Sequence, residues 1–186
     1  METTNGPWTI RGSKIVYQNP HIRVVEDQVA QPDGQPGSYA TVQMKTGVCV
    51  LPIDRDGSLY LTRQFRYAIG SESLEAACGG MDEDGDPRQA AGRELREELG
   101  IEAQDWRSLG AVHTDTSILK SVNHLFLARE LSFTRTEREG TETIRTVKLS
   151  LEQAVRMVME GEIVHAVSGL LILKAWQTLQ GAPPPA

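Results

Sequence analysis

Three glutamates lie close together in the stretch DPRQAAGRELREELG, residues 86–100. On a helix that turns 100° per residue, Glu94, Glu97 and Glu98 fall within an arc of roughly 100°. Like charges three and four positions apart destabilise a helix by roughly 0.2–0.5 kcal/mol per pair unless positive charge offsets them. That charge can come from arginines on a solvated, salt-bridged face, the common case for a charged helix, or from a metal ion.

The ends of this helix are predicted by local residue types. Asp86 suits the N-cap, Pro87 suits the first turn, Gln89 can complete a capping box, and Gly100 suits a left-handed stop. An apolar stripe runs beside the glutamates, formed by Ala91, Leu95 and Leu99. The carboxylates are therefore expected at the edge of the core.

Composition bounds the class of protein. The 186 residues are 39% hydrophobic and 24% charged, which is typical of one globular domain or a compact domain with an appendage. A net charge of -6 disfavours nucleic-acid and membrane-surface partners. The N-terminal residues resemble no secretion signal, and Cys49 and Cys78 are expected to be buried thiols, so a cytoplasmic location is predicted.

The remaining elements follow from short apolar runs and turn signals. Residues 11–30 alternate as two strands joined at Asn19-Pro20, and several β-branched runs follow on either side of the acidic helix. Ser150 and Gln153 predict the start of a further helix, and a last helix covers about residues 164–179. This order predicts an α+β sandwich with a mixed sheet.

The acidic stretch belongs to a longer motif. GGMDEDGDPRQAAGRELREELGI resembles the Nudix box, the G-x5-E-x7-R-E-U-x-E-E-x-G-U signature (U aliphatic) of hydrolases of nucleoside diphosphates linked to another moiety. One position departs, because Gly85 stands where the box has its first glutamate, and Asp84 or Asp86 is expected to substitute for it. The residues in register are Gly79, Arg93, Glu94, Leu95, Glu97, Glu98, Gly100 and Ile101.

The resemblance implies a Nudix α/β/α sandwich with a mixed sheet, preceded by antiparallel strands. The expected organisation is an N-terminal β-strand segment at 1–45 that forms a dimer, a Nudix hydrolase domain at 46–180, and a disordered tail at 181–186. By the same resemblance, Mg²⁺, with Mn²⁺ as an alternative, is held by oxygen ligands. The implied ligands are Glu94, Glu97, Glu98 and a backbone carbonyl of Cys78 or Gly79.

The arginines of the helix are expected to differ in role. Arg93 is the box arginine, which by resemblance orients a glutamate without touching substrate. Arg88 and Arg96 are interpreted as ordinary surface partners of the acids, since such pairs are common and weak.

The resemblance runs from about Trp8 to Trp176 and points to the ADP-ribose and nucleotide-sugar pyrophosphatase branch. It makes Arg63 and Arg66 candidates to bind phosphates or ribose, although either could lie on a strand's solvent face. Glu75 is a candidate to bind ribose or a metal-bound water. Trp8 is a candidate to stack on the base in a homodimer, with plain strand packing as the alternative.

The catalytic base is predicted on the stretch TEREGTETIRTV, where Glu139 and Glu142 both qualify and Glu97 is the fallback. Three other titratable residues, His113, His124 and His165, are interpreted as hydrogen-bonded structural histidines.

The resemblance implies a magnesium-dependent enzyme that splits a nucleoside diphosphate sugar into a nucleoside monophosphate and a sugar phosphate. ADP-ribose is the leading candidate. Many ADP-ribose hydrolases carry a proline shortly after the box, whereas this chain has none between Pro87 and Pro183, so GDP-mannose or another nucleotide sugar stays open. The alternative from another class is a Nudix-fold sensor that binds a nucleotide sugar without hydrolysing it.

Overall fold

The computed structural model describes residues 2–82, 84–136 and 144–181, which form two compact units. The first unit contains Met1–Lys45 and His113–Val122, and the second contains Thr46–Val112 and Asn123–Ala186. The segment 113–122 therefore belongs with the N-terminal strands.

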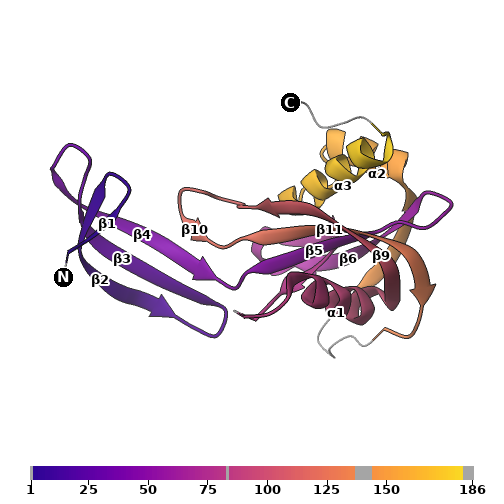
Figure 1. Ribbon diagram of the computed structural model, residues 1–186, viewed down its shortest axis with the longest axis horizontal. Helices are drawn as coiled ribbons and strands as arrows, with labels where there is room; N and C mark the ends of the chain where they lie inside the picture. The colour runs from indigo at the N-terminus through magenta and orange to yellow at the C-terminus, as the bar shows by residue number, and fades with distance from the viewer. Residues whose placement is uncertain (1, 83, 137–143, 182–186) are drawn as a thin grey trace. The chain divides into compact units, whose positions relative to one another are not determined.

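The first unit is a five-stranded sheet in the order β1-β2-β3-β4-β10 (Figure 1). Its strands pair antiparallel except β10, which runs parallel to β4. Asn19 makes the turn predicted between the first long strands, because its side-chain oxygen accepts the backbone N–H groups of His21 and Ile22, both at 2.8 Å. The strands are β1 (Thr3–Asn5), β2 (Trp8–Gln18), β3 (Ile22–Ala30), β4 (Pro36–Met44) and β10 (Leu119–Lys120).

The second unit contains two sheets and three α-helices. A four-stranded mixed sheet has the order β8-β5-β11-β9, and a three-stranded antiparallel sheet has the order β12-β6-β7. The strands are β5 (Gly47–Pro52), β6 (Ser58–Arg66), β7 (Ser71–Glu75), β8 (Ala77–Gly80), β9 (Ile101–Val112), β11 (Asn123–Phe133) and β12 (Arg145–Ser150). The helices are α1 (Pro87–Leu99), α2 (Leu151–Met159) and α3 (Ala166–Leu179), with a short 3-10 helix at Tyr67–Ile69.

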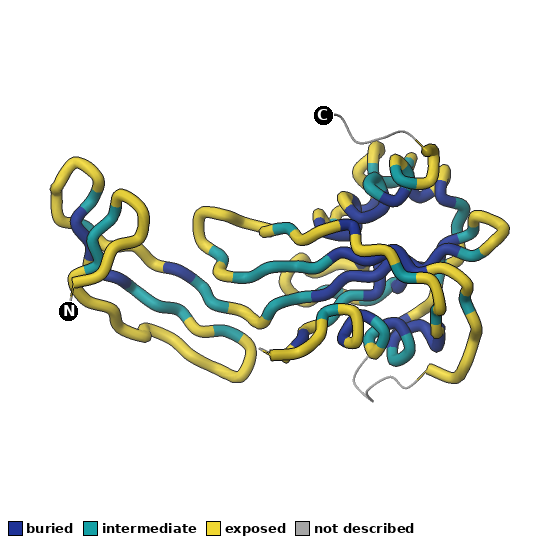
Figure 2. Tube along the Cα trace, in the orientation of Figure 1, coloured by how far each residue is buried: buried dark blue, intermediate teal, exposed yellow. Residues whose placement is uncertain are grey.

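Strand β5 separates two apolar cores. Its side chains alternate, so Val48 and Val50 pack with the buried residues of α1, whereas Cys49 and Leu51 pack with those of α2 and α3. The central strands are buried on both faces, as the dark blue segments of Figure 2 show. This arrangement is an α/β/α sandwich, and the predicted α+β class with a mixed sheet is confirmed.

The helix ends were predicted from local capping residues. The Asp86 side chain accepts the backbone N–H of Gln89 at 2.8 Å, and Gly100 adopts a left-handed φ of 64°. At α2, Ser150 and Gln153 form both bonds of a capping box. Asp86 is thus occupied in capping, and its substitution for the first box glutamate stays a prediction.

The expectation of two buried thiols is wrong, because Cys49 and Cys78 form a disulfide between β5 and β8. The two residues stand directly opposite each other in the strand register, with their Cα atoms 4.2 Å apart. Sequence spacing could not reveal this pairing, since 29 positions separate them and only the register brings them together. Among the described residues, no helix is long and apolar enough to cross a membrane.

Candidate functional site

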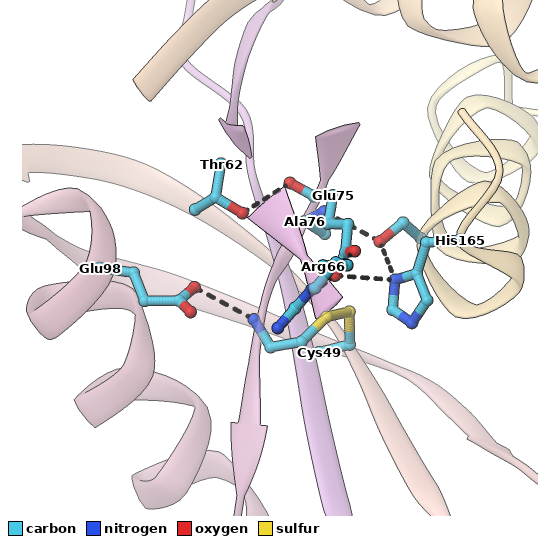
Figure 3. Close-up of a disulfide and its surroundings, with 9 residues drawn as sticks. Cys49, Thr62, Arg66, Glu75, Ala76, Glu98 and His165 are labelled. Atoms are coloured by element: carbon cyan, nitrogen blue, oxygen red, sulfur yellow. Dashed lines mark hydrogen bonds and ion pairs between the residues drawn. A yellow bond between two sulfur atoms is a disulfide. The ribbon is translucent and has the colours of Figure 1, made fainter. Parts of the chain in front are cut away.

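The candidate site is built on the outer side of β8, an edge strand of its sheet. The short Cα separation of Cys49 and Cys78 is that of a non-hydrogen-bonded antiparallel pair, so the N–H and C=O of Cys78 point away from β5. The Cys78 N–H donates to Glu98 Oε2 at 3.3 Å (Figure 3). Gly79, opposite Val48, is in a hydrogen-bonded pair, so its own carbonyl points toward β5.

Glu94 reaches the same strand one residue further along. Its carboxylate lies directly against the α-carbon of Gly79, at the place that any side chain there would occupy. Both glutamates are largely shielded from solvent, since Glu98 is 6% exposed and the Glu94 side chain is 14% exposed. Two carboxylates of α1 therefore lie beside the backbone of Cys78 and Gly79.

Arg93 ties the helix carboxylates to β8. Its Nη2 donates to the Gly80 carbonyl at 2.9 Å and to Glu94 Oε1 at 3.1 Å. Its Nε lies 3.9 Å from Glu97 Oε2, and the Glu97 side chain is 35% exposed. Arg93 thus contacts two of the three glutamates, and Glu97 is the most exposed of them.

The chemistry of the donors fits a hard divalent cation. Within the described ranges, no three side chains of His, Cys, Asp or Glu are grouped as a ready-made metal site. Glu94 and Glu98 nevertheless provide carboxylate oxygens, and the Cys78 carbonyl points to the side of β8 on which Glu98 lies. Mg²⁺ takes oxygen ligands and keeps several waters, so a few protein oxygens suffice.

A second polar cluster surrounds Glu75, which is 3% exposed (Figure 3). Arg66 donates to its two oxygens, from Nε at 3.0 Å and from Nη2 at 2.6 Å. His165 Nδ1 lies 3.4 Å from Glu75 Oε2 and 2.8 Å from Ser168 Oγ. Ser168 Oγ in turn accepts the Ala76 N–H at 2.9 Å. Sequence reasoning had not singled out Ser168 and had given His165 only a structural role.

The pKa values of this cluster have identifiable causes. Burial raises the pKa of Glu75, but the hydrogen bond and charge of Arg66, together with the charge that His165 carries only at acid pH, hold it below the ordinary 4.5. Burial, helped by Arg66 and opposed by Glu75, lowers the pKa of His165 below 6.5. His165 is therefore neutral at pH 7, and its contact with Glu75 is that of a neutral ring.

Both shifts act on stability in the same direction. Glu75, with a lowered pKa, contributes stability that is present above about pH 4.5 and is lost as the pH falls through its folded value. His165 also has a lowered pKa, so the unfolded chain takes up its proton first. Its share of stability is complete above about pH 6.5 and declines as the pH falls toward the folded pKa.

The two arginines predicted to bind substrate have different partners. Arg63 Nη1 lies 3.9 Å from Glu72 Oε2, whereas Arg66 binds Glu75. Arg145, directly opposite Arg63 on β12, also donates to Glu72. Sequence reasoning missed Arg145, because its place beside Arg63 depends on the pairing of β12 with β6.

Trp8 lies in the first unit, where it lines a cavity of about 250 Å³. Its ring meets that of Tyr39 edge to face, with centroids 5.5 Å apart. The same cavity is lined by the buried polar residues Asp27 and Thr41.

The two candidate bases, Glu139 and Glu142, lie outside the described residues.

Comparison with known proteins places this geometry in a family. A family model described as NUDIX domain matches residues 44–166, and one described as nucleoside diphosphate sugar hydrolase N-terminal domain matches residues 8–42. An ADP-ribose pyrophosphatase of Mycobacterium tuberculosis is 30% identical over 178 residues, covering 93% of this chain and 86% of that protein. A GDP-mannose pyrophosphatase of Citrobacter koseri is 30% identical over 135 residues, covering 68% and 71%. A crystal structure of an ADP compounds hydrolase has a TM-score of 0.80 at 23% identity over 94% of this chain and 96% of that one, which shows the fold.

Replacing Gly79 with alanine tests the contact between β8 and Glu94. The added methyl group overlaps the Glu94 carboxylate, which must move, whereas the backbone of Gly79 tolerates alanine. We expect the dissociation constant for Mn²⁺, measured by calorimetric titration, to rise about tenfold or more, with a nearly unchanged melting temperature.

Gly92→Ala on α1, the helix that carries Glu94, is the matched control for Gly79→Ala. Its methyl would meet the Trp106 ring at ordinary distances of 3.8 and 3.9 Å. This control should raise stability by about 0.5–1 kcal/mol, as alanine does inside helices, and leave Mn²⁺ binding unchanged. Equal Mn²⁺ affinity in wild type and Gly79→Ala would contradict the placement of the cation beside Gly79.

Proposed function

We propose that this chain, which belongs to the Nudix family of hydrolases, cleaves the pyrophosphate bond of a nucleoside diphosphate sugar into a nucleoside monophosphate and a sugar phosphate. The observation that carries the proposal is the approach of Glu94 and Glu98 to the backbone of Cys78 and Gly79. A pyrophosphate is a dense anion and the chain carries a net charge of -6, so cations must lie between substrate and carboxylates.

Mg²⁺, with Mn²⁺ as an alternative, is the proposed cofactor. Glu94, Glu98 and the Cys78 carbonyl are its proposed ligands, with Glu97 as the third carboxylate. When bound, a divalent ion polarises a phosphoryl oxygen and lowers the pKa of an attacking water. Gly79 contributes by having no side chain, which leaves room for Glu94.

The chain's own residues orient the reacting groups. Arg93 holds Glu94 and the Gly80 carbonyl in place, which supports a role in orienting Glu94 as a metal ligand. Arg66 is fixed by its bidentate bond to Glu75 while its side chain stays 41% exposed, which suits binding of a phosphate or ribose oxygen. Arg63, 39% exposed, is proposed to bind there as well, and Glu75 acts on substrate through Arg66.

In the proposed reaction, a water oxygen forms a bond to one phosphorus and the bridging phosphorus–oxygen bond breaks. The proton of that water passes to a glutamate base, for which Glu139 and Glu142 are proposed, with Glu97 as the alternative. The bridging oxygen leaves on the second phosphate.

ADP-ribose is the proposed substrate. Support comes from the M. tuberculosis ADP-ribose pyrophosphatase, whose match covers 93% of this chain. GDP-mannose is the second candidate, favoured by the 30% identity to a GDP-mannose pyrophosphatase. A sensor that binds without hydrolysis is disfavoured, because Arg93 and the three helix glutamates of the box, Glu94, Glu97 and Glu98, are present.

We further propose that two copies associate through the first unit and that the protein acts without nucleic-acid or membrane partners, which its net charge of -6 disfavours. Strand β2 exposes Ile15, Val16 and Tyr17 by 55, 48 and 54%, an apolar run that a second copy of the strand would cover. Trp8 and the cavity beside it are proposed to receive the nucleobase, since an aromatic ring offers a stacking surface.

Glu98→Gln tests the proposed reaction. Glutamine keeps the shape and an oxygen that can accept the Cys78 N–H, but it removes a ligand charge. We expect turnover to fall by about a hundredfold or more while the fold is kept. The assay is phosphate release, coupled to a phosphatase, over ADP-ribose, GDP-mannose and other nucleotide sugars with magnesium.

The control for Glu98→Gln is the melting temperature with and without magnesium. Magnesium should raise it in wild type and have less effect in the variant. Wild-type turnover in Glu98→Gln would refute the ligand assignment, and binding without product from any sugar would favour the sensor.

Steady-state kinetics on Glu139→Gln and Glu142→Gln test the base. A base accepts a proton from water and adds little to substrate affinity, so its loss should lower kcat by about 10²–10⁴-fold with KM nearly unchanged. We expect this result for Glu142, which is closer in the sequence to strand β12, whereas Glu139 precedes Gly140. Full kcat in both variants would transfer the role to Glu97.

Light scattering at micromolar concentration tests the dimer. We expect twice the mass of the 20.5 kDa chain, and a monomer for a variant with Ile15 and Tyr17 both changed to glutamate. A monomeric wild type would refute the dimer.

A further inference from the structure

The residue before α3 is an unusual choice for its position. His165 is the N-cap of the helix, where Ser, Thr, Asp or Asn normally accepts a backbone N–H, and its side chain makes no such bond. The ring instead turns to Ser168 and Glu75, and Figure 3 shows its other nitrogen pointing away from both. The contact with Glu75, rather than helix capping, accounts for a histidine here.

The neighbours of the ring determine where its proton lies. If Ser168 donated to Nδ1, the lone pair of that nitrogen would also face Glu75 Oε2 at 3.4 Å, which sets two acceptors against each other. If Nδ1 carries the hydrogen, it donates to Ser168 Oγ and is attracted to the carboxylate. Ser168 Oγ then accepts from both the ring and the Ala76 N–H, which its two lone pairs allow. The charge of Glu75 therefore selects the Nδ1–H tautomer.

Hydrogen bonds and the contact with Glu75 connect this ring with the residue assigned to substrate, Arg66, and with the strand segment beside the proposed metal ligands. Glu75 holds both donors of the Arg66 fork, and Ser168 holds the backbone of Ala76. Two residues after Ala76, the N–H of Cys78 donates to Glu98. The start of α3 is thus joined by hydrogen bonds to the strand segment that carries the candidate site.

We propose that His165 is a positioning residue of the hydrolytic site, which in its Nδ1–H form fixes the Glu75 carboxylate so that Arg66 is aimed at substrate. This inference rests on the proposed function, because Arg66 is assigned to substrate there. The charged and polar groups that face the ring are Glu75 of β7, Arg66 of β6 and Ser168 of α3. His165 touches neither substrate nor metal in this role.

Three substitutions of His165 distinguish the roles of its two ring nitrogens. His165→Asn retains an N–H donor at the place of Nδ1, His165→Gln places one nearer Nε2, and His165→Phe keeps a ring without nitrogen. We expect KM for the best nucleotide sugar to rise about threefold to tenfold in the Phe and Gln variants, with kcat within about twofold of wild type. His165→Asn should restore KM to within about twofold of wild type. His21→Asn, an exposed histidine in the first unit, is the matched control and should behave as wild type.

Nitrogen-15 NMR of the wild type measures the tautomer independently of activity. The chain has four histidines, so the His165 signal is assigned as the one lost in His165→Asn. We expect a protonated Nδ1 and an unprotonated Nε2 at pH 7.5, without added substrate.

Two outcomes would overturn the proposal. An Nε2–H tautomer would do so whatever the activity, and so would a KM that rises equally in the Asn and Phe variants while both melt as wild type does. Failure of the proposed function is seen differently, as a wild type that releases no product from any nucleotide sugar while its His165 tautomer is as expected.

Discussion

The register of β8 against β5 is the constraint on which the candidate site depends. In this register the Cys78 side chain points toward Cys49 while its N–H and C=O point outward, and the next residue, Gly79, presents its bare α-carbon to Glu94. A slip of one residue would exchange the two faces, and the slip that brings Cys78 opposite Val48 would place a side chain where Glu94 lies. The Cys49–Cys78 disulfide covalently fixes this register, so the bond acts on the geometry of the site as well as on the core.

The same sandwich that buries the core also brings charges to its border. Helix α1 packs Leu95 and Leu99 against one face of the central sheet, which carries Glu98 to 6% exposure and Glu94 close to β8. Burying a carboxylate is costly unless hydrogen bonds or positive charge compensate it. The Cys78 N–H and Arg93 supply part of that compensation, and a divalent cation would supply the rest. Binding of the cation would then offset the unfavourable clustering of like charges on α1.

Sequence reasoning succeeded where the determinants are local and failed where they depend on register. Asp86, Gly100, Ser150 and Gln153 act within a few residues of the helix ends they cap, so the boundaries of α1 and α2 could be predicted. The placement of Glu94 and Glu98 near Cys78 and Gly79 followed from a family motif whose spacing encodes a strand, loop and helix. The Cys49–Cys78 bond could not be predicted, because two buried cysteines look alike in a sequence whether or not their strands are paired. For the same reason Arg145 was missed, since its place beside Arg63 depends on the pairing of β12 with β6.

His165 illustrates a different limit. Its apolar surroundings in the sequence indicated a structural histidine, which describes its burial and its bond to Ser168 but not its effect on Glu75. A buried carboxylate held by one arginine already has a partner for each oxygen, and a third contact adds less to stability than to orientation. Orientation matters here because Arg66 can present a fixed guanidinium only if its own counter-ion is fixed, and Glu75 is the last residue of the short strand β7. The start of α3 is a rigid element to which that carboxylate can be tied, so the helix that closes one core of the sandwich also restrains a side chain of the site.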